Sequence, residues 1–151
     1  MGKAEVFKPF VEKTMKEVLG VDELVVDSDG DVPVRWGSAM FYVRVLDGDT
    51  PLVRIFCPLV RNVKRTCKLL EFVNEINCKS VMTTVQWIDD DVLATTELRA
   101  ESLDKDTLEF ACNNMGYLAD TFDDQIKEKF GGDLMFADQG DEKEGDEKVD
   151  V

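Results

Sequence analysis

The stretch from Val25 to Cys57 limits the possible folds more than any other part of the chain, because turn signals divide it into short apolar runs. The turn signals are Asp29-Gly30, Gly37-Ser38 and Asp47-Gly48-Asp49. Short apolar runs that are separated by Gly and Asp turns are typical of β-hairpins. We therefore expect four short antiparallel strands in this stretch.

Two of these turns predict how neighbouring strands pair. The two-residue turn at Gly37-Ser38 places Trp36 opposite Ala39. The three-residue loop Gly48-Asp49-Thr50 places Val45 opposite Val53. Because side chains alternate along a strand, both turns put apolar residues on the same face. The same register pairs Val34 with Phe41, Val32 with Val43 and Val43 with Ile55. The predicted core face holds Val32, Val34, Trp36, Phe41, Val43, Val45, Val53, Ile55 and Cys57.

The opposite face of these strands, which we call the outer face, mixes apolar residues with arginines. It places Arg44 opposite Arg54, and like charges across a strand pair are unfavourable unless acids or another chain neutralise them. Aromatic residues, Met and Arg are enriched at protein interfaces. Two interpretations stay open: the chain itself covers this face or leaves it solvated, or the face binds another molecule. The candidate binding residues are Arg35, Met40, Tyr42, Arg44, Leu52, Arg54 and Phe56.

Helical patterns surround the predicted strands. Apolar residues at intervals of three and four predict helices over about 4–19, 65–79 and 103–130. Two further strands are expected over 81–88 and 92–99, where Thr, Val and Trp are frequent. The order of helix, four strands, helix, two strands and helix indicates an α+β fold with helices against an antiparallel sheet.

Composition narrows the class of protein. The chain has 151 residues, of which 44% are hydrophobic, so it can form one domain with one core. Its formal net charge of −14 repels phosphate backbones, which argues against nucleic acid and favours basic or amphipathic protein partners. No window approaches 18 apolar residues, so no membrane insertion is expected. We expect a domain over residues 1–137 and a disordered acidic tail over 138–151.

The cysteines and the absence of histidine bear on metals and compartment. The four cysteines are widely spaced, and a zinc site without His or paired Cys is improbable. No secretory signal is visible, so we expect reduced, mostly buried thiols and a cytoplasmic protein. No cofactor is expected. The cysteines are Cys57, Cys67, Cys78 and Cys112.

The acids could indicate a metal site or catalysis. The segment from Asp27 to Asp31 has acids at the first, third and fifth positions of an EF-hand loop, but Val32 and Ser38 occupy positions that need Gly and a bidentate acid. A hairpin turn with exposed acids fits better. Because there is no histidine base, no GxGxxG and no Walker pattern, we expect no enzymatic activity.

Several segments together carry a resemblance to a known family. They are DSDGDVPVRWGSAMFYVRV, VRIFCPLVRNV, LLEFVNEINCK, the hairpin Val81–Glu97 and LADTFDDQIKEKFGG. In this order the chain resembles the YbjN family, in particular the actinobacterial proteins that are grouped with type III secretion chaperones as YbjN-like peptide-binding chaperones. The resemblance covers the chain from Ala4 to Gly132, and the segment Asn74-Glu75-Ile76-Asn77 is its most characteristic part.

The resemblance implies a secretion-chaperone-like fold and a function without catalysis. Chaperones of this kind are small, acidic, cytoplasmic homodimers, and they hold an extended client segment on apolar patches, partly by strand addition. YbjN relatives are also described as sensory transduction regulators. The alternative is therefore a regulatory module that binds one folded partner.

Overall fold

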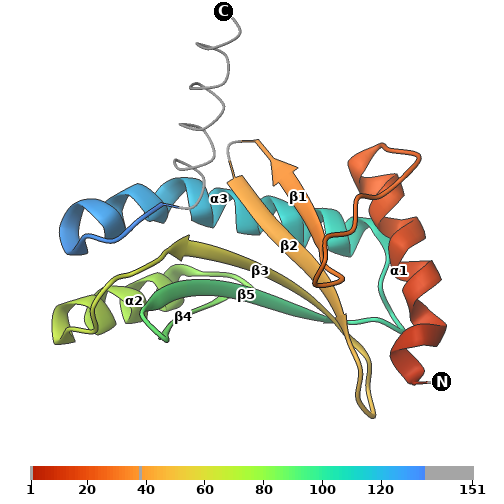
Figure 1. Ribbon diagram of the computed structural model, residues 1–151, viewed down its shortest axis with the longest axis horizontal. Helices are drawn as coiled ribbons and strands as arrows, with labels where there is room; N and C mark the ends of the chain where they lie inside the picture. Colours follow the sequence, from red (N-terminus) through yellow and green to blue (C-terminus); the bar gives the residue numbers. More distant parts are fainter. Residues whose placement is uncertain (1, 38, 135–151) are drawn as a thin grey trace, which may run out of the picture.

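The computed structural model describes residues 2–37 and 39–134, which form the expected α+β order (Figure 1). The five strands of this part of the chain form one antiparallel sheet in the order β1-β2-β3-β5-β4. The elements are α1 (Lys3–Leu19), β1 (Val32–Trp36), β2 (Ala39–Leu46), β3 (Leu52–Val60), α2 (Cys67–Lys79), β4 (Thr84–Ile88), β5 (Asp91–Arg99) and α3 (Lys105–Phe130).

The register that the turns predict is confirmed. Trp36 lies opposite Ala39, and Val45 lies opposite Val53. Gly37 has a φ of 61°, in the left-handed region that the turn between β1 and β2 requires. The other predicted pairs also form: Val34 with Phe41, Val32 with Val43, Val43 with Ile55 and Arg44 with Arg54.

The core lies between one face of the sheet and the helices. In Figure 1, α3 runs behind the sheet, α1 lies at the β1–β2 end and α2 lies beside β4. Phe41, Val53 and Ile55 are fully buried on the predicted core face, whereas Trp36 and Val45 are only partly buried at its edge. Each large apolar side chain that is fully buried stabilises the fold by about 1.5–3 kcal/mol, so this face anchors the helices.

The first of the four predicted strands does not form. Residues 21–31 connect α1 to β1 without a strand, and Val25 and Val26 are exposed. The reason is a closed local loop in which the Asp27 N–H donates to the Asp31 carbonyl at 2.8 Å and the Asp27 carboxylate accepts further N–H bonds. These bonds hold the chain in a tight turn and do not bring the preceding residues alongside β1.

The hairpin of β4 and β5 follows its turn chemistry. Asp89 and Asp90 have φ values of 50° and 67°, and Ile88 lies opposite Asp91. Two consecutive positive φ angles are the type I′ pattern, which matches the twist of the flanking strands. The two expected strands therefore join at these aspartates, although β4 begins at Thr84 and not at the expected residue 81.

The helix ends are set by capping side chains. Thr66 caps α2 by accepting the Leu69 N–H at 3.1 Å, so α2 begins two residues later than the predicted Arg65. Asp104 caps α3 by accepting the Thr107 N–H at 2.7 Å, and this bond lowers the pKa of the Asp104 carboxyl. As predicted, α3 ends where the glycine pair begins, at Gly131.

The thiols are only partly as expected. All four are free, but Cys67 and Cys78 are exposed on α2, and only Cys57 and Cys112 are buried. The spacing of the cysteines could not reveal which of them the fold exposes. Among the described residues, no helix is both long enough and apolar enough to cross a membrane. The predicted tail, residues 138–151, lies outside the described residues.

Candidate functional site

The structure brings the seven predicted binding residues together on the outer face of β1, β2 and β3. The register pairs Arg35 with Met40, Tyr42 with Phe56 and Arg44 with Arg54, and Leu52 follows at the start of β3. The helices pack against the other face, so none of the described helices covers these residues. Six of the seven are half-buried by their neighbours, and Arg35 is exposed.

The two facing arginines are neutralised inside the chain. Arg44 forms a bidentate ion pair with Asp31, with Nε–Oδ1 at 2.5 Å and Nη2–Oδ2 at 2.7 Å. Arg54 pairs with Glu97, its neighbour on β5, at 2.8 Å. The side-chain bond to Asp31 raises the pKa of the Arg44 guanidinium. Acids of the same chain therefore neutralise both facing arginines, and no second chain is needed for this. The two arginines lie beside the apolar centre of the outer face.

Two aromatic rings form that apolar centre. Tyr42 stacks on Phe56 with ring centroids 5.4 Å apart, and the Arg44 guanidinium lies 5.4 Å from the Phe56 centroid. Partial burial raises the pKa of the Tyr42 hydroxyl above its ordinary value. Stacked rings beside a guanidinium offer a flat, rigid contact area to an apolar or carbonyl-bearing segment.

The acidic turn before β1 has a structural role. The carboxylates of Asp27, Asp29 and Asp31 lie close together, with one oxygen from each within 4.8 Å of the others. Asp27 Oδ1 accepts the N–H groups of Asp29 and Asp31, each at 2.9 Å, and Asp31 is occupied by Arg44. The prediction of exposed acids is wrong for Asp31, which is buried because Arg44 draws its carboxylate against the sheet.

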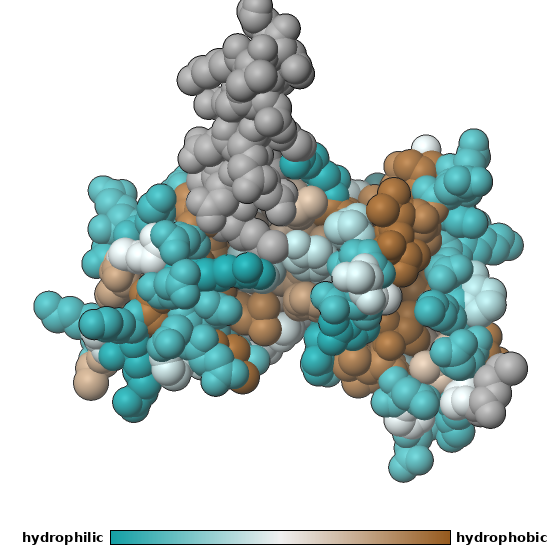
Figure 2. Space-filling view, viewed as in Figure 1, coloured by the Kyte–Doolittle hydropathy of each residue, from teal (hydrophilic) through white to brown (hydrophobic). Residues whose placement is uncertain are grey.

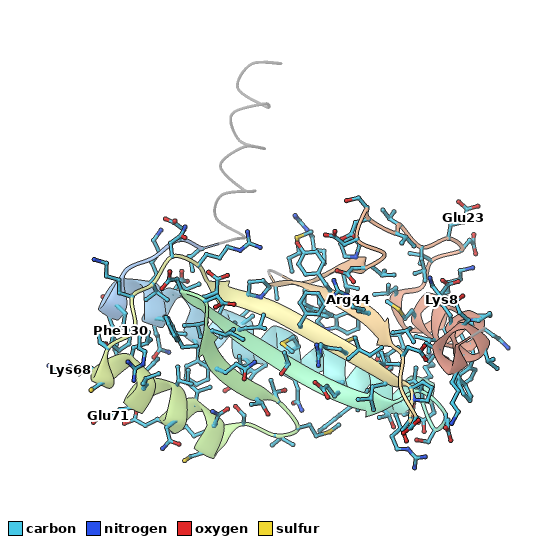
Figure 3. All side chains as sticks on the ribbon, turned by 60° about the horizontal axis from the view of Figure 1, so that its bottom comes forward. Lys8, Glu23, Arg44, Lys68, Glu71 and Phe130 are labelled. Atoms are coloured by element: carbon cyan, nitrogen blue, oxygen red, sulfur yellow. The ribbon has the colours of Figure 1, made fainter. Side chains whose placement is uncertain are left out.

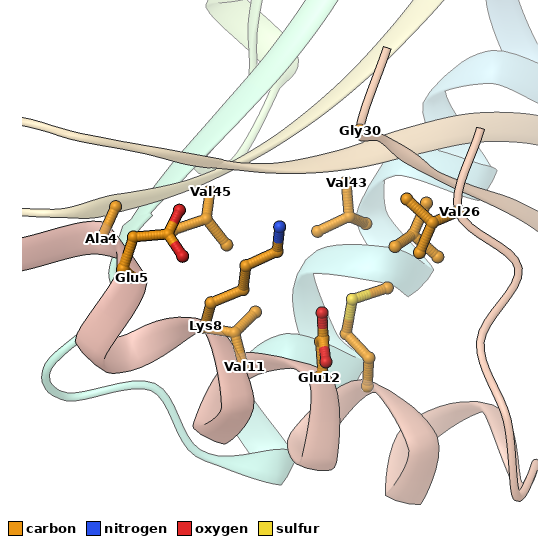
Figure 4. Close-up of a pocket in the computed structure, with 11 residues that line it drawn as sticks. Ala4, Glu5, Lys8, Val11, Glu12, Val26, Gly30, Val43 and Val45 are labelled. Carbon is orange, nitrogen blue, oxygen red and sulfur yellow. The ribbon is translucent and has the colours of Figure 1, made fainter. Parts of the chain in front are cut away.

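A groove between α1 and β2, which we call the helix groove, was not predicted from the sequence. It is a pocket of about 80 Å³ with a valine and methionine floor, and Lys8 points from α1 between Val43 and Val45 (Figure 4). A hydrophobic strip continues beside it over α1 and the segment that follows (Figure 2). The exposed apolar residues of these two segments are Val6, Phe10, Val21, Val25 and Val26. The pair Val25-Val26 is the signal that the sequence offers for this groove, but its apolar character predicts a strand equally well.

Each edge of the sheet has a feature that hinders the addition of another strand. The β1 edge contains Pro33, which has no N–H to donate. At the β4 edge, the carboxamide of Asn77 bonds both the N–H and the C=O of Val85. Strand addition at Val85 would have to displace Asn77, so the structure favours the open face over this edge.

The buried titratable groups fit a structural role. Burial raises the pKa of the Cys57 and Cys112 thiols to about 12, so both are neutral core side chains at physiological pH. Burial, together with neighbouring acids, raises the pKa of Asp123 on α3 to about 6. None of these three groups belongs to the outer face. The outer face instead presents aromatic rings and guanidinium groups.

A five-stranded antiparallel sheet with helices on one face is the fold of type III secretion chaperones. Solved structures of this fold match nearly their whole length. The HopA1-SchA chaperone–effector complex matches with a TM-score of 0.60 and 13% identity, covering 82% of this chain and 98% of that chain. The ExsC-ExsE complex matches with a TM-score of 0.58 and 12% identity, covering 82% and 95%. The Yersinia pestis type III secretion chaperone SycH, in complex with a stable fragment of YscM2, matches with a TM-score of 0.55 and 13% identity. This match covers 73% of this chain and 97% of that chain.

The family follows from the sequence itself. The family model described as "T3SS (YopN, CesT) and YbjN peptide-binding chaperone 1" matches residues 5–138. The chain therefore belongs to this family of peptide-binding chaperones, and the resemblance drawn from its segments is confirmed. No curated protein matches the sequence.

Proposed function

We propose that this protein is a non-catalytic chaperone that binds an extended segment of a client protein on its outer face. The observation that carries the proposal is the stacked pair of Tyr42 and Phe56 on a sheet face that no described helix covers. Aromatic rings beside Met40 and Leu52 supply apolar area, which is the usual source of affinity at a protein interface. Membership of the peptide-binding chaperone family supports this proposal.

The arginines of the outer face would bind the polar groups of the client. Arg44 and Arg54 each spend two guanidinium nitrogens on a carboxylate of the chain itself. A guanidinium has five N–H donors, so each retains donors for client carbonyls or carboxylates. The ion pairs fix both side chains in place, which reduces the entropy lost when a client binds.

The helix groove would hold a second part of the same client. Its valine side chains lie on the core face at the β1–β2 end of the sheet, and Val26, which also lines the groove, is exposed to the solvent. An extended segment that passes around the β1 edge could reach both surfaces. This path agrees with the closed β4 edge, where Asn77 occupies the backbone groups of Val85.

Further parts of the proposal concern assembly and setting. We propose a cytoplasmic homodimer with a folded domain over residues 1–137 and an acidic tail over 138–151. Free exposed thiols at Cys67 and Cys78 suit a reducing compartment. Sedimentation equilibrium of the full chain tests the dimer, and a single monomeric species would contradict it.

The alternative function is a regulatory module that binds one folded partner.

Site-specific photocrosslinking tests the function and the surface together. A benzophenone amino acid replaces Met40 in the full chain, and crosslinked peptides are mapped by mass spectrometry in cells that produce the protein. We expect extended amphipathic segments from clients. Tyr42→Ala or Phe56→Ala should lower their capture about tenfold or more, because truncation of a hot-spot ring costs about 2 kcal/mol or more.

The matched control is Tyr117→Ala, which removes a well-exposed tyrosine from α3 on the helical side of the molecule. It should leave capture at Met40 unchanged. Capture that is indifferent to both Tyr42→Ala and Phe56→Ala would overturn the outer face as the client surface. Capture of a single folded partner through surface residues would favour the regulatory module.

A further inference from the structure

Basic side chains gather at the end of the molecule where α2 begins and α3 ends. The run RNVKRTCK, residues 61–68, contains four basic residues and no acid, in a chain whose net charge is −14. Lys129 joins them from the last turn of α3. Figure 3 shows Lys68 and Phe130 at this end of the molecule. We call these residues the basic patch: Arg61, Lys64, Arg65, Lys68 and Lys129.

Three residues of the basic patch surround one open pocket. Lys64, Lys68 and Lys129 line a hollow of about 570 Å³. The remaining lining residues are Asn62, Thr66, Cys67 and Phe130. All five basic-patch residues are exposed, and none of them forms an ion pair with another described residue. The pocket therefore presents lysine side chains that form no ion pair with the described acids.

The start of α2 adds to this positive potential. A helix N-terminus carries partial positive charge and leaves its first N–H groups without intrahelical acceptors. Thr66 accepts the Leu69 N–H, but the first turn of α2 contains no acid and places Lys68 there instead. Lys129 is held nearby, with its Nζ 4.5 Å from the centroid of the Phe72 ring on α2.

The chain leaves the described region beside the basic patch. Arg61 and Asp133 exchange backbone hydrogen bonds of 2.9 and 2.8 Å, and the Asn62 amide donates to the Asp133 carboxylate at 2.9 Å. The acidic segment that follows begins at Asp138, four residues after Leu134. Four extended residues span at most about 14 Å, so the first acid of this segment starts within reach of the basic patch.

We propose that the acidic segment Asp138–Val151 docks on the basic patch of its own chain. The segment contains seven acids and two lysines, a net charge of −5 that is opposite in sign to the basic patch. Single surface ion pairs are weak. However, a tether of a few residues raises the effective concentration to about the millimolar range, so several weak pairs suffice. The docked segment fills the pocket between the start of α2 and the end of α3.

Zero-length crosslinking of the full chain tests the proposal. A carbodiimide joins a carboxylate to an amine only when the two are in contact, and mass spectrometry then locates the joined residues. We expect the acids of residues 138–151 to be joined to Lys64, Lys68 and Lys129. The yield should fall severalfold as the salt concentration rises from about 0.01 M to about 1 M, because the screening length shrinks from about 30 Å to about 3 Å.

An equal mixture of ¹⁵N-labelled and unlabelled chains separates the possible occupants. Crosslinks that join only residues of the same isotope support the proposal. If the occupant were a second copy of the chain, about half of the crosslinks would join a labelled to an unlabelled chain, and this outcome would overturn the proposal. Crosslinks spread evenly over exposed lysines elsewhere, such as Lys13 and Lys105, or no crosslinks to the basic patch, would also overturn it.

Charge reversal gives an independent readout in the full chain. In Lys64→Glu/Lys68→Glu the amide NMR signals of residues 138–151 should move to the positions that they take at high salt in the unaltered chain. The matched control, Lys13→Glu/Lys105→Glu, makes the same change of charge at exposed lysines of α1 and α3. It should leave these signals in place, and equal shifts in both variants would overturn the proposal.

Discussion

Gly132 lies directly against Val60, so closely that a Cβ atom on Gly132 would come within 2.5 Å of the Val60 Cγ1 atom. The same Cβ would lie 2.6 Å from the Arg61 carbonyl oxygen, and Gly132 has a φ of 93°. The contact occurs where the chain returns from α3 and forms the bridge between Arg61 and Asp133. Only glycine fits this position, which sets where the acidic segment leaves the domain.

Gly132→Ala should lower the free energy of unfolding by about 3 kcal/mol, since backbone strain and overpacking each cost about 1–3 kcal/mol. Urea unfolding measures the loss. Gly131→Ala is the matched control, because Gly131 has a φ of 84° but a methyl group there would meet no atom within 4 Å, so the substitution introduces strain alone. A loss in Gly131→Ala that equals or exceeds the loss in Gly132→Ala would contradict the role of the Val60 contact.

Arg44→Met should destabilise the protein more than Arg54→Met does. The side chain of Asp31, the partner of Arg44, is 5% exposed, so Arg44→Met leaves a buried carboxylate without its cation. We expect a loss of about 2 kcal/mol, below the roughly 3–5 kcal/mol of a fully buried pair because the Arg44 side chain is 42% exposed. The side chains of Arg54 and Glu97 are 38% and 41% exposed, so neither charge is buried and Arg54→Met should cost less than about 1 kcal/mol.

A double-mutant cycle with Asp31→Asn and Arg44→Met isolates the pair itself. Thermal unfolding of the four proteins should give a coupling free energy of about 1–2 kcal/mol. Independent effects of the two substitutions would show that the bidentate contact contributes nothing to stability.

The sequence predicted the strand pairing well because turn chemistry and side-chain alternation agree there. Gly37 requires a turn, and the turn then determines which residues face each other from Trp36 to Val45. The same reasoning failed at Val25 because Asp27 closes a local loop with its own neighbours. Such a loop depends on side-chain bonds that alternation does not reveal.

The surfaces of the molecule were harder to predict from the sequence than the pairing of its strands. The seven outer-face residues share one face because they belong to paired strands, whereas the helix groove joins α1 to strands that are far away in sequence. The acid that neutralises Arg44 comes from a turn that was expected to be exposed. The basic patch had a visible signal in RNVKRTCK, but its neighbour Lys129 is about sixty residues away and joins it only through the packing of α3 beside α2.

Asn77→Ala should destabilise the protein and open an edge of the sheet. The Asn77 amide donates to the Val85 carbonyl at 2.9 Å, and the Val85 N–H donates to the Asn77 Oδ1 at 2.7 Å. Loss of both bonds should cost about 1–3 kcal/mol, since each bond contributes about 0.5–1.5 kcal/mol. Because β4 is an edge strand, the freed groups should also promote strand pairing between molecules.

Asn74→Ala provides the matched control, because Asn74 has the same side chain on the same helix and is exposed. Urea unfolding and light scattering at increasing concentration measure the two effects. If Asn74→Ala loses as much stability, or if Asn77→Ala associates no more than the unaltered chain, the role of Asn77 as an edge cap is contradicted.

Asp123→Asn should stabilise the protein at neutral pH. Burial raises the pKa of Asp123 to about 6 in the folded chain, whereas an unfolded aspartate has a pKa of about 3.9. A raised pKa means that folding favours the protonated form. The stability that Asp123 contributes is therefore fully present below about pH 4 and is lost as the pH rises through about 6.

The ionised Asp123 thus weakens the fold at pH 7–8, and asparagine, which cannot ionise, removes that cost. Asp123 is only half-buried, so solvent screening reduces the expected gain at pH 8 to about 1 kcal/mol. Thermal unfolding between pH 8 and pH 4 should show that the gain shrinks towards zero as the pH falls. Glu109→Gln removes an exposed carboxylate from the same helix and serves as the control for the loss of one negative charge. A gain in Asp123→Asn that is constant with pH would mean that ionisation of Asp123 is not its source.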